Sequence, residues 1–378
     1  MTDGWIIPKQ VFDNGALLSG MAVQVVDGRA TDMSRVAEVP LDAPQHAVQG
    51  VLIPGFVDLQ VNGGGGVLFN AAPTLAGLMT IATAHRRFGT VALMPTVITD
   101  APAVLAKAAD AVIAMKALCG QAGLHIEGPH IAAARRGTHA AEHVRPFDDA
   151  TLGVVRKLRA AGVTVMMTLA PEVVPIDRIA ALVKMGVIVS LGHSDATAEQ
   201  AHAAFAAGAR SVTHLYNAMS QMQGRAPGLA GAAINSDAYV GIICDGAHVD
   251  DAMVALACRA RPVAGRMVLV SDAMPTVGGP DHFDLYGQRI ALRDGRLINA
   301  EGNLAGAHAT MLWGVQRLAG QVGLPLEQAL QMAITAPSEL LGKPHLGRVT
   351  GRFIDDLFLL DDRLALQPLS GNIRHDIA

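Results

Sequence analysis

Short apolar runs alternate along most of the chain with longer stretches that are rich in alanine and leucine. Eight of these runs have the length of a buried β-strand, and they cover residues 51–59, 89–98, 124–127, 163–169, 187–191, 211–215, 239–244 and 267–270. Strands that are buried on both faces have nearly continuous apolar sequences, which is typical of parallel sheets. Most of the gaps have helical length and composition, as in residues 73–87, 101–118 and 196–207. Eight strand–helix units without a dinucleotide-binding glycine fingerprint predict an α/β protein with a closed (β/α)₈ barrel of the TIM type.

The two ends of the chain have a different pattern. Residues 1–50 alternate short apolar runs with Gly, Asp and Pro, and the pair Asp27-Gly28 after one run is a hairpin signal. Residues 348–360 are again strand-like. We therefore expect residues 1–50 and 345–378 to form one small discontinuous β-sandwich domain, and residues 51–344 to form the catalytic barrel.

Composition narrows the class of protein. Apolar residues make up 51% and charged residues 16%, so the interior must be large. The formal net charge is −4 and the chain has no basic run, so we expect no binding to nucleic acid or to a membrane. No apolar run reaches the ~18 residues of a membrane span, and no secretion signal is recognisable. Cys119, Cys244 and Cys258 lack the CxxC spacing and indicate reduced thiols, so we expect a cytoplasmic protein.

Polar residues gather where the apolar runs end. His193 follows the fifth run and His214 ends the sixth, and the ends of parallel strands joined by a helix lie on the same edge of a sheet. Each histidine alone could simply close its strand with a hydrogen bond, but the matched pair favours two metal ligands. Glu127 ends the third run and adds a carboxylate. One carboxylate and two histidines with an open position form a known catalytic zinc set.

Asp272 follows the eighth run and has a different predicted task. A metal ion lowers the pKa of its bound water towards roughly 7. A carboxylate beside that water can accept its proton and pass it to a leaving group. The alternative is that Asp272 caps a helix after the strand.

Two further features concern anion binding. Arg225 lies in the glycine-rich loop 219–231 and is either a solvated loop charge or an anion clamp, and His248 after the seventh run favours the clamp. The glycines at 63–66 lack the Lys-Ser/Thr of a phosphate-binding loop. They indicate close approach of backbone segments instead.

These residues together resemble a known family. The string Pro54-Gly55-Phe56-Val57-Asp58, with Glu, His, His and Asp on strands 3, 5, 6 and 8, resembles the amidohydrolase superfamily. Within it, residues 50–340 resemble the N-acetylglucosamine-6-phosphate deacetylases. The strings that carry this second resemblance are His125-Ile126-Glu127-Gly128-Pro129, Arg135-Arg136-Gly137-Thr138-His139, Thr168-Leu169-Ala170-Pro171-Glu172, Gly192-His193-Ser194, His214-Leu215-Tyr216-Asn217-Ala218-Met219, Gly224-Arg225, Pro227-Gly228-Leu229-Ala230-Gly231, Asp245-Gly246-Ala247-His248-Val249 and Ser271-Asp272-Ala273.

The resemblance implies hydrolysis of the acetamide of N-acetyl-D-glucosamine 6-phosphate to D-glucosamine 6-phosphate and acetate. It implies that Glu127, His193 and His214 hold one divalent metal ion per subunit, which we expect to be Zn²⁺, with Fe²⁺, Co²⁺ and Mn²⁺ as alternatives. Asp272 would be the general base and then the acid, and His139 would contact the sugar or polarise the carbonyl. The implied substrate contacts are Thr138, His139, Asn217, Ala218, Arg225, His248, Leu304, Ala305, Gly306 and Ala307. The family is typically homodimeric and builds its phosphate pocket with the neighbouring subunit, so we expect a homodimer.

Two departures from the family pattern matter. Most amidohydrolases have His-x-His after strand one, where this chain has Gln60 and Asn62, which are poor ligands for a transition metal. We therefore predict a mononuclear site. Residues 307–311 stand where the family usually has serine and leucine residues, and His308 among them is either an additional polar group or a surface residue. Two other functions remain as alternatives, namely another amidohydrolase, such as a D-amino-acid deacylase or a dihydroorotase-like enzyme, and a barrel without catalytic activity.

Overall fold

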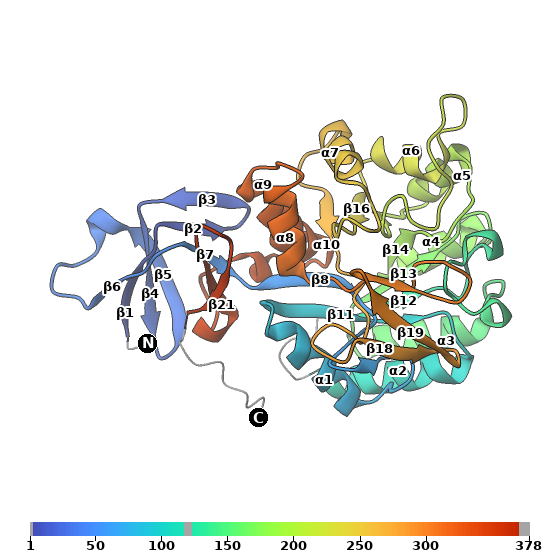
Figure 1. The fold of residues 1–378 in the computed structure, drawn as a ribbon, viewed down its shortest axis with the longest axis horizontal. Coiled ribbons are helices and arrows are strands. Elements are labelled where there is room, and N and C mark those ends of the chain that lie inside the picture. The colour runs from blue at the N-terminus through green and yellow to red at the C-terminus, as the bar shows by residue number, and fades with distance from the viewer. Residues whose placement is uncertain (1–2, 117–122, 370–378) are drawn as a thin grey trace.

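An eight-stranded parallel sheet forms the centre of the molecule in this computed structural model, which describes residues 3–116 and 123–369. Its strands in chain order are β8 (Phe56–Val61), β11 (Thr90–Ile98), β12 (Leu124–Glu127), β13 (Val165–Leu169), β14 (Ile188–Leu191), β15 (Ser211–Val212), β16 (Tyr239–Ile242) and β17 (Met267–Leu269). Each strand pairs with the next one along the chain (Figure 1). The sheet nearly closes on itself, because Val61 forms a parallel bridge with Ala273 just beyond β17. The predicted eight-stranded parallel barrel sheet is confirmed.

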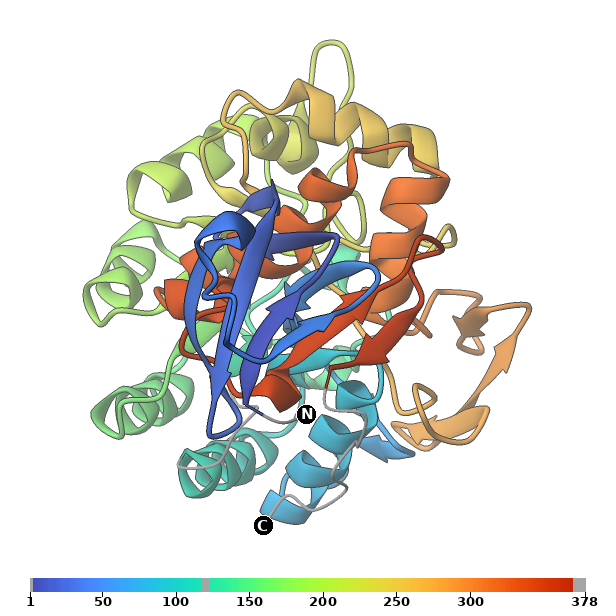
Figure 2. The same cartoon turned by 90° about the vertical axis from the view of Figure 1, so that its left-hand side faces the viewer.

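Helices surround this sheet, as Figure 2 shows. They are α1 (Leu75–Arg86), α2 (Pro102–Met115), α3 (Asp149–Ala160), α4 (Ile176–Lys184), α5 (Ala198–Ala206), α6 (Gly228–Ile234), α7 (Asp251–Ala260) and α8 (Met311–Gly320). Side-chain caps begin several of them; Thr74, for example, accepts a hydrogen bond from the backbone N–H of Gly77. The predicted helix 101–118 corresponds to α2, and its last two residues lie outside the described part of the chain. After α8, the chain continues through α9 (Leu326–Leu330), a π-helix (Gln331–Thr335) and α10 (Ala336–Leu340).

The two ends of the chain contribute two smaller sheets, which lie in front of the barrel in Figure 2. One has the order β5-β4-β1-β6 and the other β22-β21-β7-β2-β3. Their strands are β1 (Gly4–Ile7), β2 (Gln10–Asp13), β3 (Ala16–Ser19), β4 (Met21–Val26), β5 (Arg29–Arg35), β6 (Gln45–Ala47), β7 (Val51–Pro54), β21 (Leu357–Leu360) and β22 (Leu366–Pro368). Ile6 and Val23 of the first sheet share an apolar cluster with Leu52 of the second.

The sequence predicted one detail of these sheets correctly and another only in part. The hairpin signal at Asp27-Gly28 is confirmed, because Val26 and Arg29 face each other across β4 and β5. In the strand-like segment 348–360, by contrast, only β21 is a strand, preceded by the 3₁₀ turn Ile354–Asp356. Residues 370–378 of the expected C-terminal segment lie outside the described residues.

The first apolar run, residues 51–59, is divided between two sheets. Its first part is β7, which pairs with β2 and β21, and its second part lies in barrel strand β8. Gly55 lies between them, and a Cβ there would be 2.3 Å from Cγ1 of Val91. A side chain at position 55 would therefore force β11 away from the point where the chain passes from one sheet into the other.

Two small antiparallel sheets lie at the edge of the barrel. Gly63–Gly64 (β9) pairs with Val67–Leu68 (β10), and a Cβ at Gly63 would be 2.4 Å from the carbonyl oxygen of Val67, as expected of closely approaching backbones. The insertion after β17 has three strands, namely β18 (His282–Leu285), β19 (Gln288–Arg293) and β20 (Arg296–Ile298). Across the described ranges, no helix is long and apolar enough to cross a membrane.

Candidate metal and catalytic site

A cavity of about 510 Å³ lies at the carboxyl ends of the barrel strands. Four of its lining residues stand on or just after strand ends: Glu127 ends β12, His193 follows β14, His214 follows β15 and Asp272 follows β17. All four are buried. The loop after β12 and the insertion after β17 supply much of the remaining wall, with residues 133–139, 302–304 and 306. The four chemically important residues predicted from the sequence therefore meet in one place.

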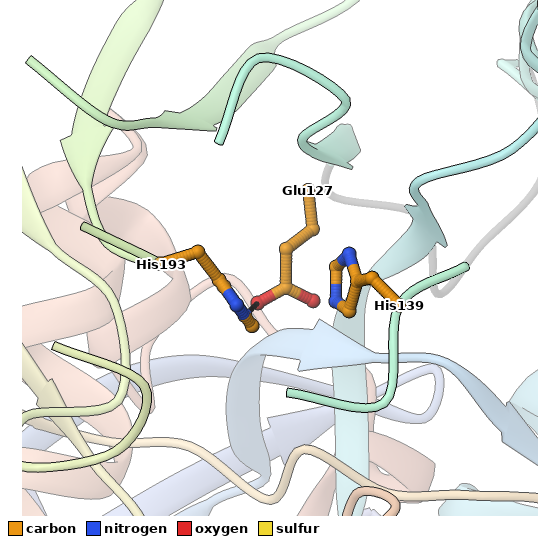
Figure 3. Close-up of side chains that lie close together, drawn as sticks. All are labelled: Glu127, His139 and His193. Atoms are coloured by element: carbon orange, nitrogen blue, oxygen red, sulfur yellow. Dashed lines mark ion pairs between the residues drawn. The ribbon is translucent and has the colours of Figure 1, made fainter. Parts of the chain in front are cut away.

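The three predicted metal ligands converge on a common point. Nε2 of His193 and Nε2 of His214 lie 3.3 and 3.0 Å from Oε1 of Glu127, and 3.1 Å from each other. Ligand atoms about 2.0–2.1 Å from one ion at tetrahedral angles lie roughly 3.3–3.4 Å apart. The donor set and its spacing therefore fit a single zinc-sized ion. His139 is also near, since Glu127, His139 and His193 each offer a ligand atom within 4.8 Å of the others (Figure 3).

Hydrogen bonding decides which nitrogen of His193 faces the cavity. Nδ1 of His193 donates to the carbonyl oxygen of Arg135 at 2.8 Å, so Nε2 of the neutral ring presents a lone pair, as a metal ligand must. Burial opposes charge on His214, but its hydrogen bond to Glu127 raises the pKa of His214. Burial likewise opposes charge on Glu127, but the two imidazoles hold its pKa well below the ordinary value. Metal binding would release the proton that His214 and Glu127 share.

Asp272 lies beside this group, and two amide side chains hold its carboxylate. Oδ1 of Asp272 accepts hydrogen bonds from Nδ2 of Asn62 at 2.6 Å and from Nε2 of Gln60 at 3.0 Å. The same nitrogen of Gln60 lies 2.9 Å from Oε1 of Glu127. Burial, and then repulsion by Glu127, raise the pKa of Asp272 to about 6, whereas a cation bound nearby would lower it. A carboxyl group held in this way can accept a proton and return it.

The backbone is strained at three of these residues. His193, His214 and Asp272 have φ angles of 47°, 31° and 50°, in the left-handed region that residues other than glycine rarely adopt. Such conformations cost roughly 1–3 kcal/mol each and persist only where the surroundings enforce them. Neighbouring backbone does so here: Ala132 N donates to His193 O at 2.8 Å, and Ala307 N donates to Asp272 O at 2.9 Å. Backbone strain of this kind often occurs at functional sites, and these three residues lie together at the cavity.

His139 lies on the loop after β12, and its ring centroid is 4.3 Å from that of His193. Nδ1 of His139 lies 2.7 Å from Oγ1 of Thr99, a residue that the sequence analysis did not identify. Burial lowers the pKa of His139 to about 3, so its ring is neutral at ordinary pH. The hydroxyl of Thr99 also lies 3.3 Å from the carbonyl oxygen of Glu127, and it has one proton to donate. When that proton goes to Nδ1 of His139, the nearer acceptor, Nε2 of His139 carries the ring proton and is a hydrogen-bond donor.

The sequence patterns did not identify Asp58 as a titrating group. It is fully buried; its Oδ1 accepts from the backbone N–H groups of Gln60 and Ser271, both at 3.2 Å, and its Oδ2 has no hydrogen-bond partner among the described residues. Burial raises the pKa of Asp58 to about 7. The available signal was a carboxylate inside a continuous apolar strand, which is costly unless it is neutral or paired.

The implied substrate contacts fall into two groups. Those that line the cavity are Thr138, His139, Asn217, Ala218, His248, Leu304 and Gly306. Ala305 and Ala307 are buried beside it without lining it, and Arg225 is exposed outside it. Nδ1 of His248 lies 2.7 Å from Oδ2 of Asp245. Burial alone would raise the pKa of Asp245, but the hydrogen bond from His248 holds that pKa at about 2.

His308 is neither free nor part of the cavity wall. Its Nδ1 lies 2.9 Å from Oγ1 of Thr276, and its ring centroid is 5.4 Å from that of Trp313. Burial lowers the pKa of His308. His308 therefore contacts Thr276 and Trp313 instead of the cavity.

Comparison with known proteins agrees with this geometry. The model of the amidohydrolase family matches residues 51–375. The chain is 39% identical over 366 residues to the N-acetylgalactosamine-6-phosphate deacetylase of Shewanella sp. (strain ANA-3), covering 94% of this chain and 92% of that protein. It is 35% identical over 298 residues to the N-acetylglucosamine-6-phosphate deacetylase of Haemophilus influenzae, covering 77% of each.

Among solved structures, the N-acetylglucosamine-6-phosphate deacetylase from Pasteurella multocida superimposes with a TM-score of 0.89 and 31% sequence identity, over 97% of both chains. Both the sequence match and the structural match extend over the barrel and the strand ends that carry Glu127, His193, His214 and Asp272. The resemblance inferred from the sequence is confirmed. The chain belongs to the amidohydrolase family, and it is a hydrolase of that family.

Proposed function

We propose that the protein removes the acetyl group from N-acetyl-D-glucosamine 6-phosphate and releases D-glucosamine 6-phosphate and acetate. The observation that carries the proposal is the convergence of Glu127, His193 and His214 beside Asp272 in a cavity of about 510 Å³. That volume lies in the range of small-molecule sites. The names of the Haemophilus and Pasteurella proteins support the substrate.

In the proposed mechanism, a divalent ion held by Glu127, His193 and His214, most simply one Zn²⁺, supplies Lewis-acid activation of water and of the acyl oxygen. Asp272 accepts the proton of the attacking water and later delivers it to the departing amine. His139 donates a hydrogen bond to the oxyanion that develops on the carbonyl. Gln60 and Asn62 keep the carboxylate of Asp272 in place, and we propose that they leave room for only one ion.

The remaining expectations are part of the same proposal. Thr138 would contact the substrate, and the turn of Leu304, Ala305, Gly306 and Ala307 would contribute backbone near the acetyl group. Asn217, Ala218 and His248 would surround the phosphate. Arg225 is exposed outside the cavity of its own chain, which suits a contribution to the neighbouring subunit of a homodimer. The protein would act in the cytoplasm, where the free thiols of Cys244 and Cys258 remain reduced. The small β-sandwich domain would comprise residues 1–50 and 345–378, although β7 pairs with its strands.

A second candidate substrate is N-acetyl-D-galactosamine 6-phosphate. It is favoured by the 39% identity to the Shewanella protein over 94% of this chain, compared with 35% over 77% for the Haemophilus protein. The two sugars differ only in the configuration at C4, so they share the acetyl group and the phosphate on which the proposed contacts act.

The test is acetate release from both 6-phosphates and from their unphosphorylated analogues, before and after a chelator and with Zn²⁺ restored. We expect a phosphorylated sugar to be preferred by at least about tenfold, since charge-assisted hydrogen bonds contribute about 1.5–3 kcal/mol each. Chelation should abolish turnover, and Zn²⁺ should restore it. A preference for the galacto epimer would select the second candidate, and acetate release from neither phosphate would refute both.

A further inference from the structure

Two segments far apart in the sequence face each other across the cavity. One is the loop after β12, which contributes residues 133–139, and the other is the end of the insertion after β17, which contributes residues 302–304 and 306. The first segment carries His139. The second has proposed backbone contacts to the acetyl group but no titratable side chain in the cavity wall.

Arg136 connects the two segments. Its Nη2 donates to both carboxylate oxygens of Glu301, at 3.0 and 2.8 Å. Its Nη1 donates to the carbonyl oxygens of His139 at 3.0 Å and Gly137 at 3.3 Å. One planar guanidinium is thus held by Glu301 on one side and by the backbone of His139 on the other. Because the guanidinium is planar and rigid, a change in the position of Glu301 would also move the backbone of His139.

Further contacts hold both ends of this connection. The turn around Glu301 is closed by Oδ1 of Asn299, which accepts from the backbone N–H groups of Glu301 and Asn303 at 3.0 and 2.9 Å. In the turn between β18 and β19, the hydroxyl of Tyr286 donates to the carbonyl oxygen of Thr99 at 2.6 Å. Oγ1 of that same Thr99 lies 2.7 Å from the ring of His139. The insertion therefore reaches His139 by two routes, through its backbone and through its ring.

We propose that Glu301 is a positioning residue for His139, acting through Arg136. It touches neither the reacting atoms nor the substrate; it holds the guanidinium against the backbone of residues 137–139 and so fixes where the imidazole stands. The inference rests on the proposed function in assigning His139 to the oxyanion. Misplacing such a group by about 1 Å can cost up to about 10²-fold in rate.

The test compares Glu301→Gln with Asp110→Asn. Asp110 on α2 forms an exposed ion pair with Lys157 on α3, so the control removes the same charge from a comparable pair away from the cavity. Glu301 is 50% exposed, and exposed ion pairs contribute little to global stability, so E301Q should fold normally. We expect its kcat for acetate release to fall about threefold to tenfold with little change in KM, because the lost interaction acts in the transition state.

Two additional measurements separate positioning from other causes. Hydrogen exchange of the amides of residues 133–140 should become faster in E301Q and remain unchanged in D110N. In an Arg136→Met background, the Glu301 substitution should have no further effect on kcat. An unchanged kcat, unchanged exchange in residues 133–140 or an independent loss in the double variant would each overturn the proposal. Absence of acetate release by the wild type would instead refute the proposed function, and the exchange comparison would still decide whether Glu301 holds this loop.

Discussion

Replacing Asp272 with asparagine removes the proposed proton carrier and almost nothing else. Asparagine has the same size and retains one carbonyl oxygen, so the donors that now bind Oδ1, Nδ2 of Asn62 and Nε2 of Gln60, keep their acceptor. The side chain should therefore remain in place. The variant loses its negative charge and its ability to take up a proton, and these are the two properties that the mechanism requires.

The size of the effect follows from the number of steps that use this carboxyl group. General acid–base catalysis contributes about 10²–10⁴-fold, and each factor of ten corresponds to about 1.4 kcal/mol of activation free energy. Asp272 would act twice, on the attacking water and on the departing amine. We therefore expect kcat to fall by at least about 10³-fold, which corresponds to about 4 kcal/mol.

The same substitution should not destabilise the fold. In the metal-free protein, burial and the charge of Glu127 raise the pKa of Asp272 from 3.8 to about 6. A shift of this size means that the ionised group costs the folded state about 3 kcal/mol near pH 7.5. Since this cost vanishes in D272N, the apoprotein variant should be at least as stable as the wild type in urea unfolding.

The assay combines acetate release, metal content per chain by mass spectrometry and urea unfolding, with Asp110→Asn as the control. Turnover of D272N within tenfold of the wild type would refute the assignment of Asp272. Loss of turnover together with loss of metal would show that Asp272 acts through the metal centre instead of through proton transfer.

Three other predictions concern neighbouring residues. Burial raises the pKa of Asp58 to about 7, so between about pH 4 and 7 the folded state binds one more proton than the unfolded state. The free energy of unfolding therefore falls as pH rises through that window. Asp58→Asn should remove up to about 4 kcal/mol of this fall, measured by urea unfolding. Equal pH dependence in both proteins would contradict the burial argument. Substituting both Gln60→His and Asn62→His should raise the metal content from one ion per chain to two, whereas a wild type that already holds two would disprove the mononuclear prediction. His248→Ala and Arg225→Ala should each lower kcat/KM for the phosphorylated sugar about 10–10²-fold, and kcat/KM for the unphosphorylated sugar should change less than about threefold. Equal losses on both sugars would exclude a phosphate contact.

The strand ends could be predicted from the sequence because two simple rules act together there. Parallel strands that alternate with helices bring their carboxyl ends to one edge, and charged or imidazole groups are conspicuous beside apolar runs. His193 and His214 satisfied both rules, and the structure places their Nε2 atoms 3.1 Å apart. Periodicity could not assign β7, however, because a buried strand has the same apolar sequence whichever sheet it joins.

Contacts between side chains that are distant in sequence were beyond the same rules. Gln60 and Asn62 were recognised as poor metal ligands, but their role as donors to Asp272 depends on an approach across 212 and 210 positions of the chain. The bond between Arg136 and Glu301 spans 165 positions and lies in two irregular segments. Such pairings require the folded backbone, since neither loop has a periodic pattern that would orient its side chains.

The amides at positions 60 and 62 also bear on the proposed role of Asp272 in proton transfer. Glu127 and Asp272 both accept from Nε2 of Gln60, so two carboxylates stand close together in a buried place. A second cation would neutralise them and lower the pKa of Asp272, but an amide N–H is a dipole and offsets their repulsion only in part. Before metal binding, burial first and then the charge of Glu127 raise the pKa of Asp272 to about 6. If the site holds one ion, as proposed, exchanging the histidines of a two-metal site for amides would spare Asp272 the second of two cations that lower its pKa, and the carboxylate would remain more basic than beside two ions.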